Sequence, residues 1–148
     1  MKVSKNFGWK CMQRLNELGI QPRQLPVLIA ISREEGISQK RLAEVLHNTP
    51  PTVNVSVQRL EKAGLVIRER DQQDQRKIHV LLTEQGTTLM NSLKDSMEEM
   101  EKEIFLGFDP EELCKVREYL ERILKNIDKI PGESCPDDPV GGKEHSCD

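Results

Sequence analysis

The order of patterns between residues 38 and 82 restricts the fold more than any other feature of this sequence. Ser38 is a good N-cap for a short helix, and Thr49 followed by Pro50 predicts the start of a second helix. The segments 65–70 and 77–82 then change to a strand-like pattern, with a long polar tip between them. Two helices followed by a hairpin predict a winged helix-turn-helix.

Helical patterns also precede this block. Apolar residues at helical spacing predict a first helix that Gly19 ends. Pro22 predicts the start of the next helix, which Gly36 ends. Pro26 is expected to lie one turn inside that helix and to bend it slightly, because it removes a backbone donor. The predicted fold class is therefore mainly α (α+β), a winged helix-turn-helix with a two-stranded wing and flanking helices.

The helices after the hairpin carry a coiled-coil pattern. A long helix is predicted after Thr83, and Asp109 with Pro110 predicts the start of the last helix. Apolar residues of the last helix recur at alternating steps of three and four, as in a coiled-coil seam. We interpret the seam as a subunit interface, although the two helices could instead pack on each other within one chain. The residues predicted in the dimer interface are Leu15, Leu113, Val116, Leu120, Ile123 and Ile127.

The second helix of the middle block has two different faces. On a wheel of ~100° per residue, Val53, Val57 and Leu60 cluster and are predicted to face the core. The opposite face suits the DNA major groove, because amide side chains pair with base edges and basic side chains meet phosphate or guanine. It could also be an ordinary solvated face. The predicted DNA contacts on or near this helix are Ser38, Thr49, Pro51, Thr52, Asn54, Val55, Gln58, Arg59 and Lys62.

The hairpin adds further candidate DNA contacts. Asp74 lies two residues before Arg76, so its carboxylate can aim the guanidinium into a narrow A·T-rich minor groove, whose negative potential attracts arginine. Arg68, Arg70 and Lys77 are predicted to meet phosphates. Two alternatives stay open: Asp74 and Arg76 form a mere surface ion pair, or the whole module contacts proteins and no DNA.

The net charge of the chain and the absence of several known motifs exclude some classes of function. The net charge of −3 argues against indiscriminate binding to polyanions, yet residues 36–82 carry eight Lys and Arg against five Asp and Glu. No segment approaches the ~20 apolar residues of a membrane span and Met1 opens no signal peptide, so we expect a soluble cytoplasmic protein. The sequence has no Gly-rich phosphate loop, His-Glu-x-x-His motif or nucleophile elbow. We therefore expect neither an enzyme nor a bound cofactor or metal.

The sequence resembles the MarR family of transcriptional regulators over about residues 19–90. The resemblance is carried by Gly36-Ile-Ser-Gln-Lys-Arg-Leu-Ala-Glu-Val-Leu46, by Arg59-Leu-Glu-Lys-Ala-Gly-Leu-Val66, by the spaced Asp71, Asp74 and Arg76, and by Leu82-Thr-Glu-Gln-Gly86. It implies a homodimer whose recognition helices enter successive major grooves of a pseudo-palindromic operator, with Arg76 in the flanking minor grooves. It also implies a regulator, usually a repressor, that a ligand or an oxidant releases.

Two positions depart from the family pattern. Gln75 stands where a second arginine is frequent, and Val55 stands where many members have arginine. Gln75 is therefore expected to weaken the wing contacts, and the base preference of other members does not transfer to this chain.

The resemblance also implies an effector crevice between the dimerisation helices and the DNA-binding lobe. In this chain it would draw on Trp9, Met12, Leu25 and Pro26, which could equally be dimer core. Cys11 offers a redox alternative, although a cysteine on the apolar side of a helix is more often a small core residue. Cys135 and Cys147 offer a metal- or oxidant-responsive alternative, although their spacing matches no standard metal site.

These patterns divide the chain into four parts. Residues 1–20 are predicted as an N-terminal dimerisation helix, 21–86 as the winged helix-turn-helix DNA-binding domain and 87–130 as C-terminal dimerisation helices. Residues 131–148 are rich in proline, glycine and acidic side chains and are predicted to form a flexible tail.

Overall fold

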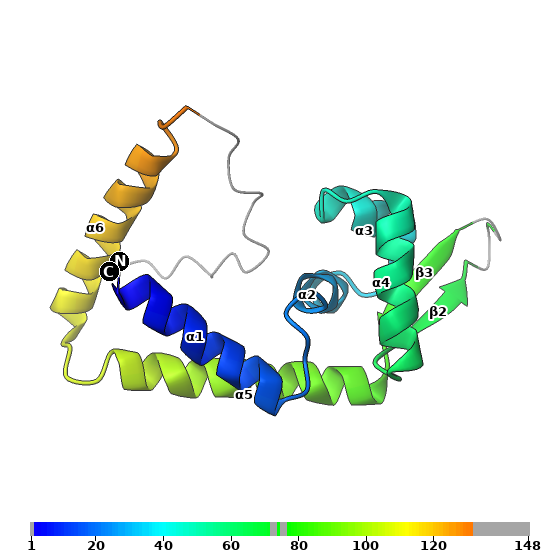
Figure 1. Ribbon diagram of the computed structural model, residues 1–148, viewed down its shortest axis with the longest axis horizontal. Coiled ribbons are helices and arrows are strands. Elements are labelled where there is room, and N and C mark those ends of the chain that lie inside the picture. The colour runs from blue at the N-terminus through cyan, green and yellow to red at the C-terminus, as the bar shows by residue number, and fades with distance from the viewer. Residues whose placement is uncertain (1, 72–73, 75–76, 132–148) are drawn as a thin grey trace. The chain divides into compact units, whose positions relative to one another are not determined.

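The helices and strands follow one another in the predicted order, with one short strand added (Figure 1). The computed structural model describes residues 2–71, 74 and 77–131. Its elements are α1 (Lys2–Glu17), α2 (Leu25–Arg33), β1 (Ile37–Ser38), α3 (Gln39–Val45), α4 (Pro50–Lys62), β2 (Val66–Arg70), β3 (Ile78–Leu82), α5 (Glu84–Ile104) and α6 (Pro110–Ile127). The chain divides into two compact units, Met1–Met97 and Glu98–Asp148, which we describe separately. The mainly helical class with a two-stranded wing is thereby confirmed.

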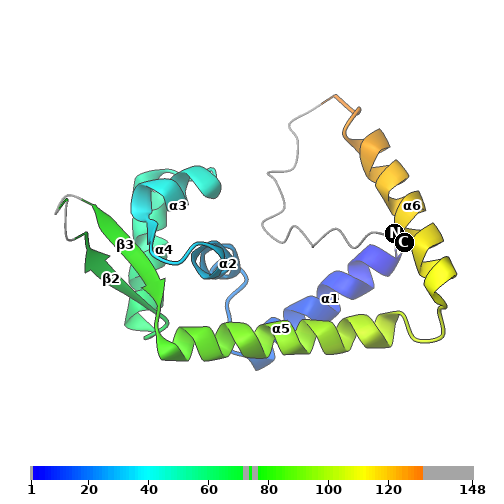
Figure 2. The same cartoon turned by 180° about the vertical axis from the view of Figure 1, so that it is seen from behind.

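The described strands of the first unit form an antiparallel sheet in the order β1-β3-β2. β2 and β3 pair from Val66 opposite Leu82 to Arg70 opposite Ile78, and the hairpin lies beside α4 in both views (Figures 1 and 2). On the other side of β3, Ile37 pairs with Val80 and Ser38 with His79. The strand β1 was not predicted. It ties the segment before α3 to the hairpin.

The core of the first unit is aliphatic and confirms the predicted inner face of α4. Val53, Val57 and Leu60 are at most 2% exposed and pack in one cluster with residues of α2, α3 and the sheet. Leu15 of α1 belongs to the same cluster and is 5% exposed. The side chain of Leu15 is thus covered within the unit, and its contribution to a subunit interface stays a prediction.

The start of α2 differs from the prediction. The helix begins at Leu25 rather than at Pro22, which lies in the turn before it, where the Gln24 amide donates to the Gln21 carbonyl at 2.8 Å. Pro26 therefore lies in the first turn of α2 and not one turn inside it. An amide at that position has no carbonyl partner within the helix, so Pro26 removes no hydrogen bond and the expected bend has no cause.

In the second unit, α6 begins where it was predicted to begin. Asp109 Oδ1 accepts from the Glu112 amide at 2.8 Å, and Glu112 Oε2 accepts from the Asp109 amide at 2.9 Å, which completes a capping box. Within the described part of the chain no residue of α6 is buried, and Leu120, Ile123 and Ile127 are each 50–54% exposed. Among the described residues, the apolar seam is thus half-buried at Leu113 and Val116 and exposed at its last three positions. Among the described helices, none is both long and apolar enough for a membrane span.

Candidate nucleic-acid interface

The helix α4 begins at the predicted residue but is not capped in the predicted way. Thr49 has the extended backbone of an N-cap, yet its side chain makes no capping hydrogen bond. Its hydroxyl is instead 2.9 Å from the hydroxyl of Thr52. The first two helical residues are Pro50 and Pro51, which have no amide hydrogens, so fewer donors of the first turn need a cap.

The outward face of α4 has the chemistry that the sequence predicted. Val55, 46% exposed, is an apolar side chain at the centre of this face. Arg59 and Lys62 lie in the last turn of the helix, and Asn54 is half-buried at its edge. The exposed residues of α4 are Pro50, Pro51, Thr52, Val55, Gln58, Arg59, Glu61 and Lys62. This face is apolar and amide-bearing towards its start and basic towards its end, as a groove-reading helix requires.

Ser38 caps the N-terminus of α3, the helix before α4. Its hydroxyl oxygen accepts from the Arg41 amide at 3.1 Å, and this confirms Ser38 as the N-cap of α3. The side chain is half-buried and used inside the protein. A contact between Ser38 and DNA stays a prediction, whereas its role in starting α3 is established.

Arg68 connects the hairpin with α4. Its Nη2 donates to the backbone carbonyl of Asn54 at 3.3 Å, and its Nε lies 3.5 Å from Glu61 Oε2. Only 21% of the Arg68 side chain is exposed. A guanidinium placed in this way supports the helix from the strand next to it, and its predicted contact with phosphate has no support in this geometry.

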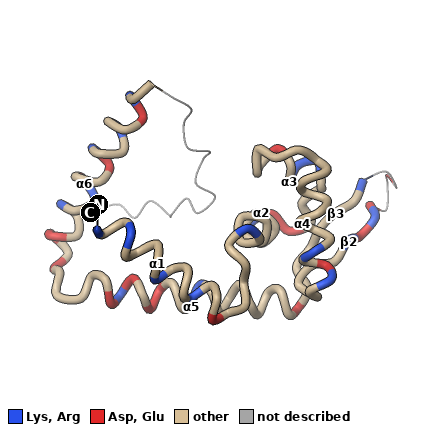
Figure 3. The backbone as a smooth tube through the Cα atoms, in the orientation of Figure 1, with Lys and Arg blue, Asp and Glu red and all other residues tan. Residues whose placement is uncertain are grey.

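Two further basic residues of the hairpin, Arg70 and Lys77, are exposed. Arg70 ends β2, and Lys77 precedes β3, with its Nζ 3.9 Å from Asp74 Oδ2. Figure 3 marks the Lys and Arg positions along the backbone in blue. Asp74 was predicted to aim Arg76, which lies outside the described residues. The Asp74 amide donates to Asp71 Oδ1 at 2.8 Å, so Asp74 takes part in the turn that Asp71 begins.

The sequence did not reveal the role of His79 in the middle of the sheet. Its Nδ1 is hydrogen-bonded to the Gly36 carbonyl, and its Nε2 lies 2.9 Å from Asp71 Oδ2. The hydrogen bond to Asp71 is the main reason that the pKa of His79 is raised. The only sequence signal was the presence of a histidine and an aspartate at the two ends of a hairpin tip, which is too common to be diagnostic.

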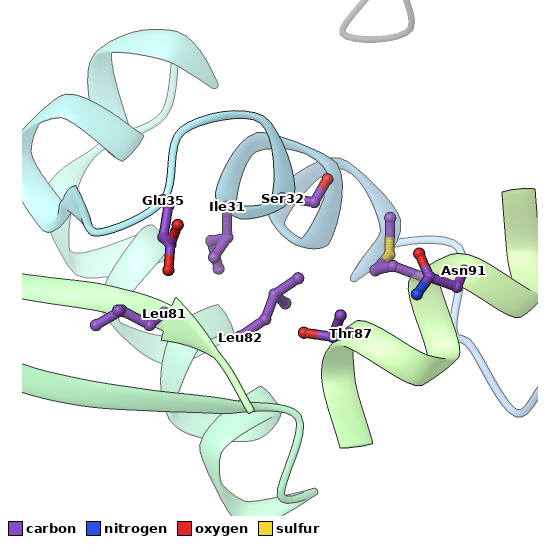
Figure 4. A pocket seen from close by; sticks show the side chains of 8 residues that line it. Ile31, Ser32, Glu35, Leu81, Leu82, Thr87 and Asn91 are labelled. Carbon is purple, nitrogen blue, oxygen red and sulfur yellow. The ribbon is translucent and has the colours of Figure 1, made fainter. Parts of the chain in front are cut away.

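A pocket lies in the first unit, on the side of α2 that meets the end of β3 and the start of α5 (Figure 4). Its volume is about 320 Å³. The lining residues are Ile31, Ser32, Glu35, Leu81, Leu82, Thr87, Met90 and Asn91. None of the four residues predicted for an effector crevice lines it. Trp9 and Met12 are 67% and 40% exposed, while Leu25 and Pro26 are half-buried.

The redox alternative at Cys11 gains no support from the described residues. Cys11 is half-buried on α1, and burial raises the pKa of its thiol, with a smaller opposing effect from its backbone hydrogen bond. A raised pKa reduces the thiolate that oxidants attack. Cys135 and Cys147 lie outside the described ranges. Over residues 2–71, 74 and 77–131, no cluster of His, Cys, Asp and Glu side chains is suited to a metal ion.

Comparisons with known proteins agree with this geometry. A family model described as "MarR family" matches residues 18–77. The HTH-type transcriptional regulator SarZ of Staphylococcus epidermidis is 32% identical over 127 residues, which cover 85% of this chain and 84% of SarZ. The crystal structure of MepR, a transcription regulator of the Staphylococcus aureus multidrug efflux pump MepA, matches with a TM-score of 0.73 at 26% identity and covers 85% of this chain and 93% of MepR. The MepR–DNA complex matches with a TM-score of 0.61 at 26% identity, over 85% of this chain and 91% of that one.

Proposed function

This chain belongs to the MarR family of transcriptional regulators, and from that premise we propose that it binds a pseudo-palindromic DNA operator as a homodimer and represses transcription until a small molecule releases it. The observation that carries the proposal is the exposed face of α4, with Val55 and Gln58 at its centre and Arg59 and Lys62 at its end. The solved MepR–DNA complex supports DNA as the partner. Regulators of this family are not enzymes, and we propose no catalytic activity.

In the proposed complex, α4 enters the major groove. Gln58 reads base edges through its amide, and Val55 contacts a thymine methyl group. Arg59, Lys62, Arg70 and Lys77 meet phosphates on either side of the groove. The hairpin that carries Arg76 reaches the neighbouring minor groove, where a narrow A·T-rich segment attracts arginine.

The dimer is supported by α6. Its apolar residues at positions 113, 116, 120, 123 and 127 follow the spacing of a coiled-coil seam, and none is buried within the described part of the second unit. An exposed apolar seam of this length is costly in water. A second copy of the chain offers the same seam, as an isologous interface requires.

We propose the open pocket beside β3 as one place where a releasing small molecule could bind. Its walls come from α2, from the end of the hairpin and from α5, so a ligand there touches both the hairpin and the helix that follows it (Figure 4). A ligand that binds one arrangement of these walls better than another shifts the population of the DNA-binding state. The residues Trp9, Met12, Leu25 and Pro26 are the alternative location for that ligand.

The test is fluorescence anisotropy with duplexes from the DNA upstream of the chain's own gene. We expect saturable binding to one duplex and an affinity loss of about 5- to 150-fold for Gln58→Ala, which is the range for one lost base contact of ~1–3 kcal/mol. Ser92→Ala is the matched control, because Ser92 is exposed on α5 away from the proposed interface. Equal binding of wild type to all duplexes, with no effect of Gln58→Ala, would refute sequence-specific recognition.

A further inference from the structure

His79 occupies a central position in the DNA-binding unit. It lies on β3, the middle strand of the described sheet, opposite Ser38 of β1 and Glu69 of β2. Its ring connects two places that are far apart in the sequence: the carbonyl of Gly36, in the turn before β1 and α3, and the carboxylate of Asp71, directly after β2. One side chain thus joins the helix-turn-helix with the start of the hairpin loop.

The two partners determine the protonation state that completes this arrangement. The Gly36 carbonyl and the Asp71 carboxylate are both acceptors. A neutral imidazole has one N–H and can donate to only one of them, whereas an imidazolium donates to both. The geometry is therefore complete only when the ring carries both protons.

Asp71 also organises the turn that follows it. Its Oδ1 accepts from the Asp74 amide at 2.8 Å, while its Oδ2 faces His79 at 2.9 Å. Its own amide donates to the Lys77 carbonyl at 3.0 Å, and the Lys77 amide donates to the Asp74 carbonyl at 2.8 Å. The positions of Asp74 and Lys77 next to the sheet thus depend on where the Asp71 carboxylate is held.

We propose that doubly protonated His79 is a positioning residue that fastens Asp71, and with it the base of the hairpin loop, to the turn before α3, so that DNA binding weakens when His79 loses a proton. The proposal rests on the proposed function, because DNA binding is its readout. His79 itself touches no DNA in this proposal. It acts through Asp71.

The charged groups around the ring favour the protonated form. Asp71 raises the pKa of His79 through its hydrogen bond and its charge, the Gly36 carbonyl raises it further, and partial burial and the charge of Lys77 oppose these effects. Glu69, the register partner on β2, is also acidic, and Ser38 on β1 is uncharged. A folded-state pKa above the unfolded value means that the interaction is fully present below about pH 6.5 and is lost as the pH rises through the folded-state pKa.

The first test is an NMR titration of the histidine rings in the free wild-type chain, with the His79 signals assigned from His79→Gln. We expect the pKa of His79 above the ordinary value of about 6.5, and a lower pKa in Asp71→Asn. An ordinary or lowered pKa in wild type would overturn the proposal. This measurement does not depend on DNA.

The second test measures operator affinity by anisotropy between pH 6 and pH 8.5 at constant ionic strength. In wild type the apparent Kd should rise with pH by about 3- to 10-fold, since Kd scales inversely with the fraction of chains whose loop is in place. His79→Gln should bind weakly across the range without this pH step. His47→Asn is the matched control and should keep the step, because asparagine tolerates the left-handed backbone at this position, where φ is 48°.

Asp71→Asn gives a signature that a merely structural role would not produce. The asparagine oxygen can still accept from the Asp74 amide, but its NH₂ group now faces His79 Nε2 and donates to a neutral ring. We therefore expect Asp71→Asn to bind at pH 8.5 about as tightly as at pH 6. A pH step in this variant equal to that of wild type, or one that survives in His79→Gln, would overturn the proposal.

Different results would overturn the proposed DNA binding and the proposed role of His79. A wild-type chain that binds no duplex at any pH overturns the proposed function, and with it the claim that His79 tunes DNA binding. A chain that binds DNA with no pH step, while His79 titrates as expected, overturns the positioning role alone.

Discussion

Replacing Arg68 by alanine distinguishes support of α4 from contact with phosphate. The guanidinium donates to the Asn54 carbonyl at 3.3 Å and lies 3.5 Å from Glu61, and the side chain is 21% exposed. We expect Arg68→Ala to lower the free energy of unfolding and to weaken DNA binding indirectly, through a less firmly held α4. We do not expect it to change the number of phosphates that the protein neutralises.

The expected loss of unfolding free energy follows from the contacts that Arg68→Ala removes. The hydrogen bond is long and contributes about 1 kcal/mol net. The ion pair contributes between about 0 and 1 kcal/mol, because the Glu61 side chain is 42% exposed and water screens it. The aliphatic stem, packed between strand and helix, adds a few tenths to the total. The expected loss is about 1–2 kcal/mol, or about 3–8 °C in Tm for a chain of this size.

Urea unfolding and salt-dependent anisotropy together provide the assay. Loss of one phosphate contact lowers the slope of log K against log salt by about 0.9, whereas loss of a supporting side chain leaves the slope unchanged. Arg59→Ala is the matched control, because Arg59 is exposed on the outward face of α4 and should change the slope with little effect on stability. Wild-type stability in Arg68→Ala together with a reduced slope would refute the supporting role.

Three further predictions concern stability and assembly. Gly86→Ala should destabilise the protein by about 1–3 kcal/mol in urea unfolding, since a Cβ at this buried position would overlap the Leu65 carbonyl; a change under 0.5 kcal/mol would contradict this. Ser38→Ala should cost about 1 kcal/mol by the same assay, because the N-cap of α3 is lost, whereas Ser38→Gly should cost only a few tenths. Ile123→Glu should turn a dimer into a monomer in light scattering, because a carboxylate would be buried in the seam; an unchanged dimer would remove α6 from the proposed interface.

The inner and outer faces of α4 could be predicted because helical periodicity alone separates them. Val53, Val57 and Leu60 repeat at steps of four and three, and the structure buries all of them. The starts of α3, α4 and α6 could be placed for a similar reason, since N-cap residues and proline act locally. These features need no knowledge of distant parts of the chain.

Other features could not be predicted because they depend on long-range contacts. The strand β1 has two residues, too few to show a period, and exists only through its pairing with β3. The surroundings of Arg68 depend on how closely β2 approaches α4, which no local pattern encodes. Pro22 misled the prediction of α2 because proline suits a turn as well as the first turn of a helix.

The contacts at the start of α5 explain why the run from Leu82 to Gly86 ends in a glycine. The Thr83 hydroxyl donates to the Gly64 carbonyl at 2.6 Å and accepts from the Gly86 amide at 3.0 Å. This brings the end of α4 against the start of α5, and only a residue without a side chain fits beside the Leu65 carbonyl. The run from Leu82 to Gly86 therefore fixes where the hairpin ends and the next helix starts.

Arg68 and His79, two side chains of the sheet that can carry a positive charge, bond to other groups of the protein. Arg68 holds α4, and His79 joins Gly36 to Asp71. In the proposed complex, the phosphate contacts from the described residues come from exposed basic side chains, which are Arg59, Lys62, Arg70 and Lys77. The chain as a whole is acidic, with a net charge of −3, which argues against indiscriminate binding to DNA. In the proposed complex, affinity comes from the fit of α4 and the hairpin to a particular duplex, and we propose that Arg68 and His79 support that fit from within the protein.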